Sequence, residues 1–286
     1  MRSLYIYILF VVFVTGTGCF HKTEKYKSPQ GYDLNHPIKY SIPEILNEVS
    51  GIAFLNGDSS MLYSEQDEEG KVFYLKPGDK KASHTKFGKN GDYEDISICN
   101  NYVIILRSDG TLFTFPFGEV GKPDAGNVQE FNKLLPKGEY EGLYGDNTTG
   151  EVYVLCKHCK ETDPSVSANI YTLQLAQDGA LSSKRSFEFP VKDIASLAGD
   201  KKMSFHPSAL ALHPFTMEWF IVSSVNKLLV IADRNWNIKA VYRLNPSLYI
   251  QPEGIAFDKY SNLYISNEGN KTTRGNVFKM AYRMNQ

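Results

Sequence analysis

Carboxylates and an amide near the end of the chain have the types and spacing of a cation site. Residues 251–270 read QPEGIAFDKYSNLYISNEGN, in which two short apolar stretches flank a polar turn. Folding this segment as a β-hairpin sets Glu253 opposite Asn267, with Glu268 beside them. Ca²⁺ prefers such oxygen ligands and takes roughly six to eight of them at ~2.3–2.6 Å. The segment therefore predicts a cation site at one end of a two-stranded ribbon.

The same hairpin pattern recurs along the chain. Five segments open with a small or acidic residue before a short aliphatic stretch, and the opening residues are Ser50, Glu94, Glu141, Ser208 and Glu253. The intervals between them are 44, 47, 67 and 45 residues, and four-stranded propeller blades repeat every ~40–50 residues. We therefore predict an all-β fold, a five-bladed β-propeller of four-stranded antiparallel blades.

The 67-residue interval predicts one blade with insertions. The additional residues fall at 157–168, a polar stretch, and at 191–205, which contains a short helical pattern over 193–198. Insertions on one face of a propeller often carry binding specificity. Drift in a tolerant surface loop is the other interpretation, and both remain open.

The last blade is one strand short. It offers residues 253–258, 263–267 and 276–282, whereas residues 38–42 alternate apolar and polar side chains as a half-buried strand does. We expect this N-terminal strand to complete the last blade, because the pairing closes the ring and covers two sheet edges. The propeller domain is therefore predicted to span residues 37–286.

Neighbouring charges indicate which carboxylates are available for a cation. The expected register sets Arg107 opposite Glu94, and Lys157 lies near Glu141, so both acids are expected to be neutralised. The pair Glu253 and Glu268 has no cation in its own motif.

Adjacent uncompensated carboxylates raise each other's pKa unless a cation intervenes. We therefore predict a Ca²⁺ site formed by Glu253, Asn267 and Glu268 and extended to Glu65 of the adjoining first blade, which is also followed by acidic residues. The alternative is that Glu253 caps backbone amides at the strand entrance while the other acids are solvated.

The segment Cys156-Lys157-His158-Cys159 is the other cluster with reactive side chains. It ends a predicted strand, whereas a redox-active pair of this spacing normally begins a helix that stabilises the thiolate. The sequence contains no second pair to complete a tetrahedral zinc site. A disulfide between Cys156 and Cys159 is plausible outside the cytoplasm, and two free thiols are the alternative.

The first 19 residues have the pattern of a targeting segment. Arg2 precedes an apolar stretch over residues 4–14, and small residues then lead to Cys19. This resembles a bacterial lipobox, in which the cysteine is lipidated, and a plain secretory signal is the alternative. We predict a lipoprotein signal peptide over residues 1–19 and a flexible tether over residues 20–36. The protein is then extracytoplasmic, in the bacterial cell envelope, and lipid-anchored to a membrane through Cys19.

The charge balance excludes broad electrostatic recruitment. The formal net charge is −1 for 286 residues, so we expect no nucleic-acid partner. The sequence contains no GxSxG nucleophile motif and no phosphate-binding glycine loop.

The repeated openings and the terminal QPEGIAFD…NLYISNEGN resemble the SdiA-regulated family of extracytoplasmic bacterial proteins. The resemblance covers about residues 38–282. It implies a five-bladed propeller and a calcium ion bound by acidic residues of the repeats. The motifs of that family do not establish a biochemical role.

These observations favour a calcium-binding, non-enzymatic module that presents a loop-lined propeller face to a protein or small-molecule ligand. The alternative is a calcium-dependent hydrolase of esters or lactones, with Glu253 and Glu268 holding the metal as a Lewis acid. A purely structural propeller without metal is a third interpretation.

Substituting Cys19→Ala is expected to release the protein from the membrane fraction, because a lipid anchor requires the thiol of Cys19. Membrane fractionation of cells that express each form measures this. Continued tight membrane association of the variant would contradict the lipoprotein prediction.

Overall fold

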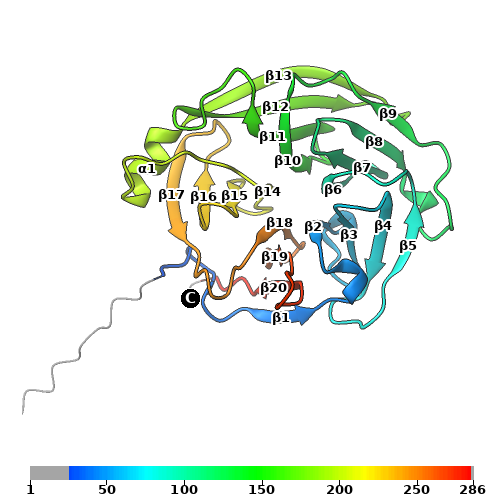
Figure 1. The fold of residues 1–286 in the computed structure, drawn as a ribbon, viewed down its shortest axis with the longest axis horizontal. Coiled ribbons are helices and arrows are strands. Elements are labelled where there is room, and N and C mark those ends of the chain that lie inside the picture. Colours follow the sequence, from blue (N-terminus) through cyan, green and yellow to red (C-terminus); the bar gives the residue numbers. More distant parts are fainter. Residues whose placement is uncertain (1–25, 285–286) are drawn as a thin grey trace, which may run out of the picture.

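The computed structural model describes residues 26–284 as five antiparallel sheets of four strands each. The sheets surround a common axis, and the strands β2, β6, β10, β14 and β18 face it (Figure 1). This arrangement is a five-bladed β-propeller, which confirms the predicted fold class. The 67-residue interval is one blade, as expected.

In each of the first four blades the strands follow one another outward from the axis in chain order. The first blade contains β2 (Val49–Ala53), β3 (Leu62–Gln66), β4 (Lys71–Leu75) and β5 (Ser83–Lys86). The second contains β6 (Tyr93–Cys99), β7 (Tyr102–Arg107), β8 (Leu112–Pro116) and β9 (Gln129–Phe131). The third contains β10 (Gly138–Gly145), β11 (Glu151–Cys159), β12 (Ser167–Leu175) and β13 (Leu181–Pro190). The fourth contains β14 (Ala209–Leu212), β15 (Trp219–Ser223), β16 (Leu228–Ala232) and β17 (Ile238–Arg243).

The fifth blade is completed by the N-terminal strand. Its order is β18 (Pro252–Phe257), β19 (Leu263–Asn267), β20 (Asn276–Met280) and β1 (Ile38–Ser41). Strand β1 pairs antiparallel with β20, with Ile38 opposite Lys279. The predicted closure of the ring is therefore confirmed.

The segment before β1 departs from the expected tether over residues 20–36. Tyr32 and Leu34 are buried against the fourth and fifth blades. The Tyr32 hydroxyl donates to the Ser261 carbonyl at 2.6 Å, and the Tyr249 hydroxyl donates to the Leu34 carbonyl at 2.9 Å. The described part of this segment is thus attached to the domain. The predicted signal peptide over residues 1–19, with Cys19, lies outside the described residues.

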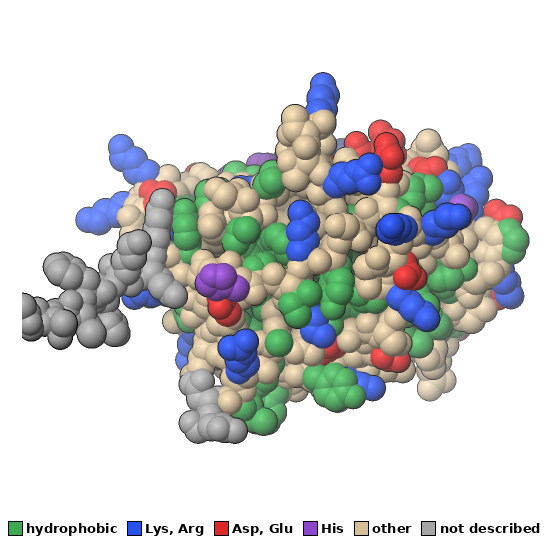
Figure 2. All heavy atoms as spheres, turned by 90° about the horizontal axis from the view of Figure 1, so that it is seen from below, with side chains coloured by type: hydrophobic (Ala, Val, Ile, Leu, Met, Phe, Trp, Pro, Cys, Tyr) green, Lys and Arg blue, Asp and Glu red, His purple; other side chains and the backbone are tan. Residues whose placement is uncertain are grey.

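Within residues 26–284, helical structure is confined to the connections. The helix α1 (Val191–Ala198) lies between the third and fourth blades, and short 3₁₀ turns cover Glu44–Leu46, Leu55–Gly57 and Phe117–Glu119. Helix α1 ends at Gly199, which adopts the left-handed conformation (φ 70°) common at helix C-termini. Its Ile194 belongs to the apolar cluster between the third and fourth blades, where Trp219 stacks on Trp236 at 4.7 Å. Figure 2 shows Lys and Arg side chains scattered singly over one side of the molecule, between acidic and apolar groups.

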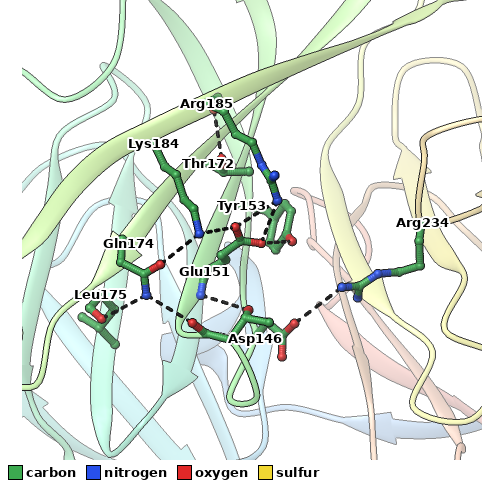
Figure 3. Close-up of polar contacts among 10 residues, drawn as sticks. Asp146, Glu151, Tyr153, Thr172, Gln174, Leu175, Lys184, Arg185 and Arg234 are labelled. Carbon is green, nitrogen blue, oxygen red and sulfur yellow. Dashed lines mark hydrogen bonds and ion pairs between the residues drawn. The ribbon is translucent and has the colours of Figure 1, made fainter.

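An ion-pair network stabilises the third blade (Figure 3). The buried carboxylate of Glu151 lies 2.6 Å from Lys184 Nζ and 3.0 Å from an Arg185 nitrogen, and it accepts the Tyr153 hydroxyl at 2.6 Å. Burial alone would raise the pKa of Glu151, but the hydrogen bonds from Lys184 and Tyr153 and the charge of Arg185 hold that pKa below its usual value. The network therefore stabilises an ionised, buried carboxylate.

Substituting Glu151→Gln is expected to lower the free energy of unfolding by about 1–2 kcal/mol, since charge-assisted hydrogen bonds are lost. Denaturant unfolding measures this. The control Glu188→Gln changes an exposed acid of the same blade and should alter stability little. Equal losses in both variants would contradict a structural role for the network.

Candidate functional site

The inner strands of three blades contain a β-bulge at their acidic opening residue. Along the chain, the register shifts between Tyr93 and Asp95, between Tyr140 and Gly142, and between Pro252 and Gly254. The residue inside each shift is Glu94, Glu141 or Glu253. A bulge inserts one unpaired residue and redirects its side chain.

These bulges correct the expected register. Pro252, not Glu253, lies opposite Asn267, and Tyr93, not Glu94, lies opposite Arg107. The extra residue of each bulge shifts the pairing by one position, which the alternating sequence pattern does not reveal.

Glycines after the opening residues let neighbouring inner strands approach closely. A Cβ on Gly254 would lie 2.4 Å from the Ser50 carbonyl oxygen, and a Cβ on Gly51 would lie 2.2 Å from Asp95 Oδ1. Neither approach leaves room for a side chain. The glycine that follows Glu253 and Ser50 is therefore required by packing between blades.

The bulged glutamates interact across the axis. Burial raises the pKa of Glu94 to about 9, and the charges of Glu141 and Asp92 add to this effect. Burial and the charge of Glu253 raise the pKa of Glu141 to about 7, although Lys157 opposes the shift. Carboxyl groups from the second, third and fifth blades thus share one electrostatic environment.

The fifth blade extends this environment toward the first. Burial raises the pKa of Glu268 to about 7, and the charges of Asp67 and Glu48 contribute. Burial and Glu48 also raise the pKa of Asp67 to about 6. Burial raises the pKa of Glu253, against hydrogen bonds from Ser224 and Ser208 and together with the charge of Glu268. We refer to Asp67, Glu94, Glu141, Glu253 and Glu268 as the acidic cluster.

The other two predicted ligands lie at its edge. Glu65 is fully buried, and its Oε1 accepts the Gly51 amide at 2.5 Å. Burial raises the pKa of Glu65 well above its usual value, and its acidic neighbours are Asp95, Glu94 and Asp67. Asn267 is buried and donates its amide to Asn276 Oδ1 at 3.3 Å.

Lys157 provides the cationic contact to the cluster that the sequence predicted. Its Nζ contacts Glu141 Oε1 and lies 3.3 Å from Glu139. The expected neutralisation of Glu94 by Arg107 is wrong, because Arg107 instead pairs with Asp109 at 2.8 Å. Glu94 thus belongs with the carboxylates that form no ion pair among the described residues.

Four buried oxygen atoms at this end of the propeller have no hydrogen-bond donor among the described residues. They are Glu65 Oε2, Asp67 Oδ1, Glu141 Oε2 and Asn267 Oδ1. An unsatisfied buried acceptor costs about 1–3 kcal/mol. The donor set, carboxylates and an amide oxygen, is that of a hard cation such as Ca²⁺. Within residues 26–284, however, no group of three His, Cys, Asp or Glu side chains is arranged to hold a metal ion.

The remaining cluster in the sequence forms a local disulfide beside Lys157. Cys156 and Cys159 are bonded, and His158 Nδ1 lies 2.9 Å from Glu139 Oε2. The ring of His158 lies 4.5 Å from that of His206. The disulfide therefore encloses the lysine that contacts Glu141.

Sequence reasoning did not assign Asp67 to the site. A signal was present, because Gln66-Asp67 ends the second strand of its blade as Asn267-Glu268 does in the fifth blade. The two blades lie next to each other, so equivalent positions face one shared region.

A family model for SdiA-regulated proteins matches residues 26–273. The chain belongs to the SdiA-regulated family. No curated protein sequence is significantly similar to this SdiA-regulated protein. The PQQ-bound aldose sugar dehydrogenase of Streptomyces coelicolor superimposes with a TM-score of 0.54 at 10% identity, over 90% of this chain and 100% of that one. A luciferin-regenerating enzyme superimposes with a TM-score of 0.53 at 10% identity, over 86% of this chain and 95% of the other. At such identity these likenesses concern the fold alone.

The acidic cluster predicts a pH dependence of stability. A folded-state pKa above the unfolded value contributes stability that is complete below the unfolded pKa and is lost as the pH rises through the folded pKa. With ordinary pKa values of 3.8 for Asp67 and 4.5 for the glutamates, and folded values of about 6 for Asp67, 7 for Glu141 and Glu268 and 9 for Glu94, this contribution should fall between about pH 4 and 9.

Melting temperatures in EDTA across that range measure the effect. Glu94→Gln should flatten the decline between pH 8 and 9, whereas Glu188→Gln should leave it unchanged. Parallel profiles for the two variants would contradict the assignment of Glu94 to the cluster.

Proposed function

We propose that this SdiA-regulated protein is a non-enzymatic binding module of the bacterial cell envelope and that its acidic cluster binds Ca²⁺. One observation carries the proposal. Burial and mutual repulsion raise the pKa values of carboxyl groups from four blades, while neighbouring buried oxygens have no donor among residues 26–284. A divalent cation would let these groups ionise together and would supply the missing partner.

The proposed ligands come from the fifth and first blades. Glu253, Glu268 and Asn267 lie at the ends of β18 and β19, and Asp67 interacts electrostatically with Glu268. Glu65 extends the set toward the second blade. Lys157, by contrast, contacts Glu141, so the third blade already contains a cation.

The contacts of Glu253 favour binding over hydrolysis. Its carboxyl group is hydrogen-bonded by the Ser208 and Ser224 hydroxyls, whereas the ring of His206 lies against His158. A calcium-dependent hydrolase would need a base directed at a nucleophile or water beside the metal. The family match and the fold are shared by both interpretations, so activity must be decided by assay.

Attachment to the membrane forms part of the proposal through Cys19. Within residues 26–284, no helix has the length and apolar character needed to cross a membrane. A lipid at Cys19 would hold the propeller at the membrane surface, with a protein or small molecule as its ligand.

Adding Ca²⁺ at 100 times its dissociation constant to the EDTA-treated chain is expected to raise the melting temperature by about 5–10 °C. Mass action contributes about 2.7 kcal/mol at that concentration, and a protein of this size gains about 2–4 °C per kcal/mol. Because protons compete for the carboxylates, the rise should be larger at pH 8 than at pH 5.

Glu253→Gln is expected to remove the calcium-induced rise, and Glu188→Gln should retain it. No rise in the unsubstituted chain would contradict the cation site, and a full rise in Glu253→Gln would exclude Glu253 from it. Turnover of an ester and lactone panel that requires Ca²⁺ and is lost in Glu253→Gln would favour the hydrolase instead.

A further inference from the structure

A second potential site lies at the opposite end of the axis from the acidic cluster. Two positions after the opening residue, every inner strand carries a branched aliphatic side chain that is at most 5% exposed: Ile52, Ile96, Leu143, Leu210 and Ile255. This aliphatic layer follows the acidic cluster along the strands. All five residues also line a cavity of about 340 Å³, which we call the axial cavity.

The walls of the axial cavity combine apolar and polar surface. Beyond the aliphatic layer they include Phe54, Ile98, Leu212 and Phe257 from four different blades. Sites for small molecules in proteins are typically ~300–1,000 Å³ and have mainly apolar walls with a few polar groups. The axial cavity therefore has the size of a small-molecule site, and its aliphatic layer offers apolar surface to part of a ligand.

The rim of the cavity carries hydrogen-bond donors. Lys259 lines the rim, is exposed, and lies over the Tyr260 ring at 5.3 Å. No carboxylate of the described residues lies within 4.0 Å of its Nζ in an ion pair. Asn147 uses its Oδ1 to accept the Asn100 amide at 2.7 Å, which leaves its NH₂ group as a donor.

The carboxylate of Asp258, at the same rim, accepts hydrogen bonds from groups of its own turn. Asp258 is buried, and its Oδ1 accepts the amides of Tyr260 and Asn262 at 2.9 Å. Its Oδ2 accepts the Ser59 and Tyr264 hydroxyls and the Asn262 side chain. Lys259 and the Asn147 amide are thus two donors available to a ligand at this rim, where Asn56 and Ser97 also line the cavity. The exposed Asp58 interacts electrostatically with Lys259 but forms no ion pair within 4.0 Å of it among the described residues.

We propose that the axial cavity binds a small organic acid, with the apolar body between the five inner strands and the carboxylate at Lys259. The two ends of the axis then differ in the ligand that they select. The acidic cluster repels anions, whereas the axial cavity combines its aliphatic layer with the ammonium group of Lys259 at the rim. This second site does not depend on cation binding at the first.

Isothermal titration of the full chain with octanoate tests the proposal, with 1-octanol and octylamine as uncharged and cationic probes of the same length. Octanoate is expected to bind in a 1:1 saturable manner and about tenfold more tightly than octanol, because a charged hydrogen bond is gained. Octylamine should bind more weakly than either. An equal or greater affinity for octanol or octylamine would overturn the proposal, as would the absence of saturable octanoate binding.

Two pairs of variants locate the binding. Lys259→Gln should reduce octanoate affinity to that of octanol, whereas Lys192→Gln, at an exposed position on α1, should leave it unchanged. Ile98→Trp should block all three probes by filling the cavity, and Ile38→Trp, on the exposed outer strand, should not. Unchanged octanoate binding in Lys259→Gln would overturn the role of the rim, and this variant tests the proposal even if Ile98→Trp does not fold.

Discussion

The pairing of β1 with β20 is the constraint on which the remaining arrangement depends. It joins the N-terminal strand to the last blade and so places the first and fifth blades side by side. Contacts between these blades follow from this closure. The Ser266 hydroxyl donates to the Ser50 carbonyl at 2.7 Å, and the charge of Asp67 adds to the effect of burial in raising the pKa of Glu268. An open ring would leave these groups in separate, solvated environments.

Ring closure also explains why ionisation of the acidic cluster is unfavourable. Five inner strands converge on one axis, and bulges at Glu94, Glu141 and Glu253 place three glutamates where their charges interact. Desolvation disfavours the ionised form of each, and like charges add to this effect. In the described part of the chain, the ion pair to this cluster comes from Lys157 of the third blade, within a disulfide loop. The carboxylates without such a partner are the basis of the proposed cation site.

The two ends of the axis have opposite chemistry because each inner strand changes character along its length. An acidic or hydroxyl residue opens the strand, a branched aliphatic residue follows two positions later, and the strand ends at a polar turn. The aliphatic layer lies between the acidic cluster and the axial cavity. A cation at one end and an apolar anion at the other can thus be bound by one scaffold without competing for side chains.

Five blades and closure by residues 38–42 could be predicted from the repeat spacing, the strand alternation and the incomplete last blade. This was possible because each blade is formed by consecutive residues, so its pattern is local in the sequence. The same locality allowed the proximity of Lys157 to Glu141 to be predicted.

Only the tertiary structure decided the remaining features, since they depend on contacts between distant residues. A bulge displaces Glu253 from Asn267, and Arg107 forms its ion pair with the nearby Asp109. Tyr32 and Leu34 pack against the last two blades. The axial cavity needs all five inner strands, so no single repeat could reveal it. Local sequence patterns specify the blades, whereas the site chemistry arises where the blades meet.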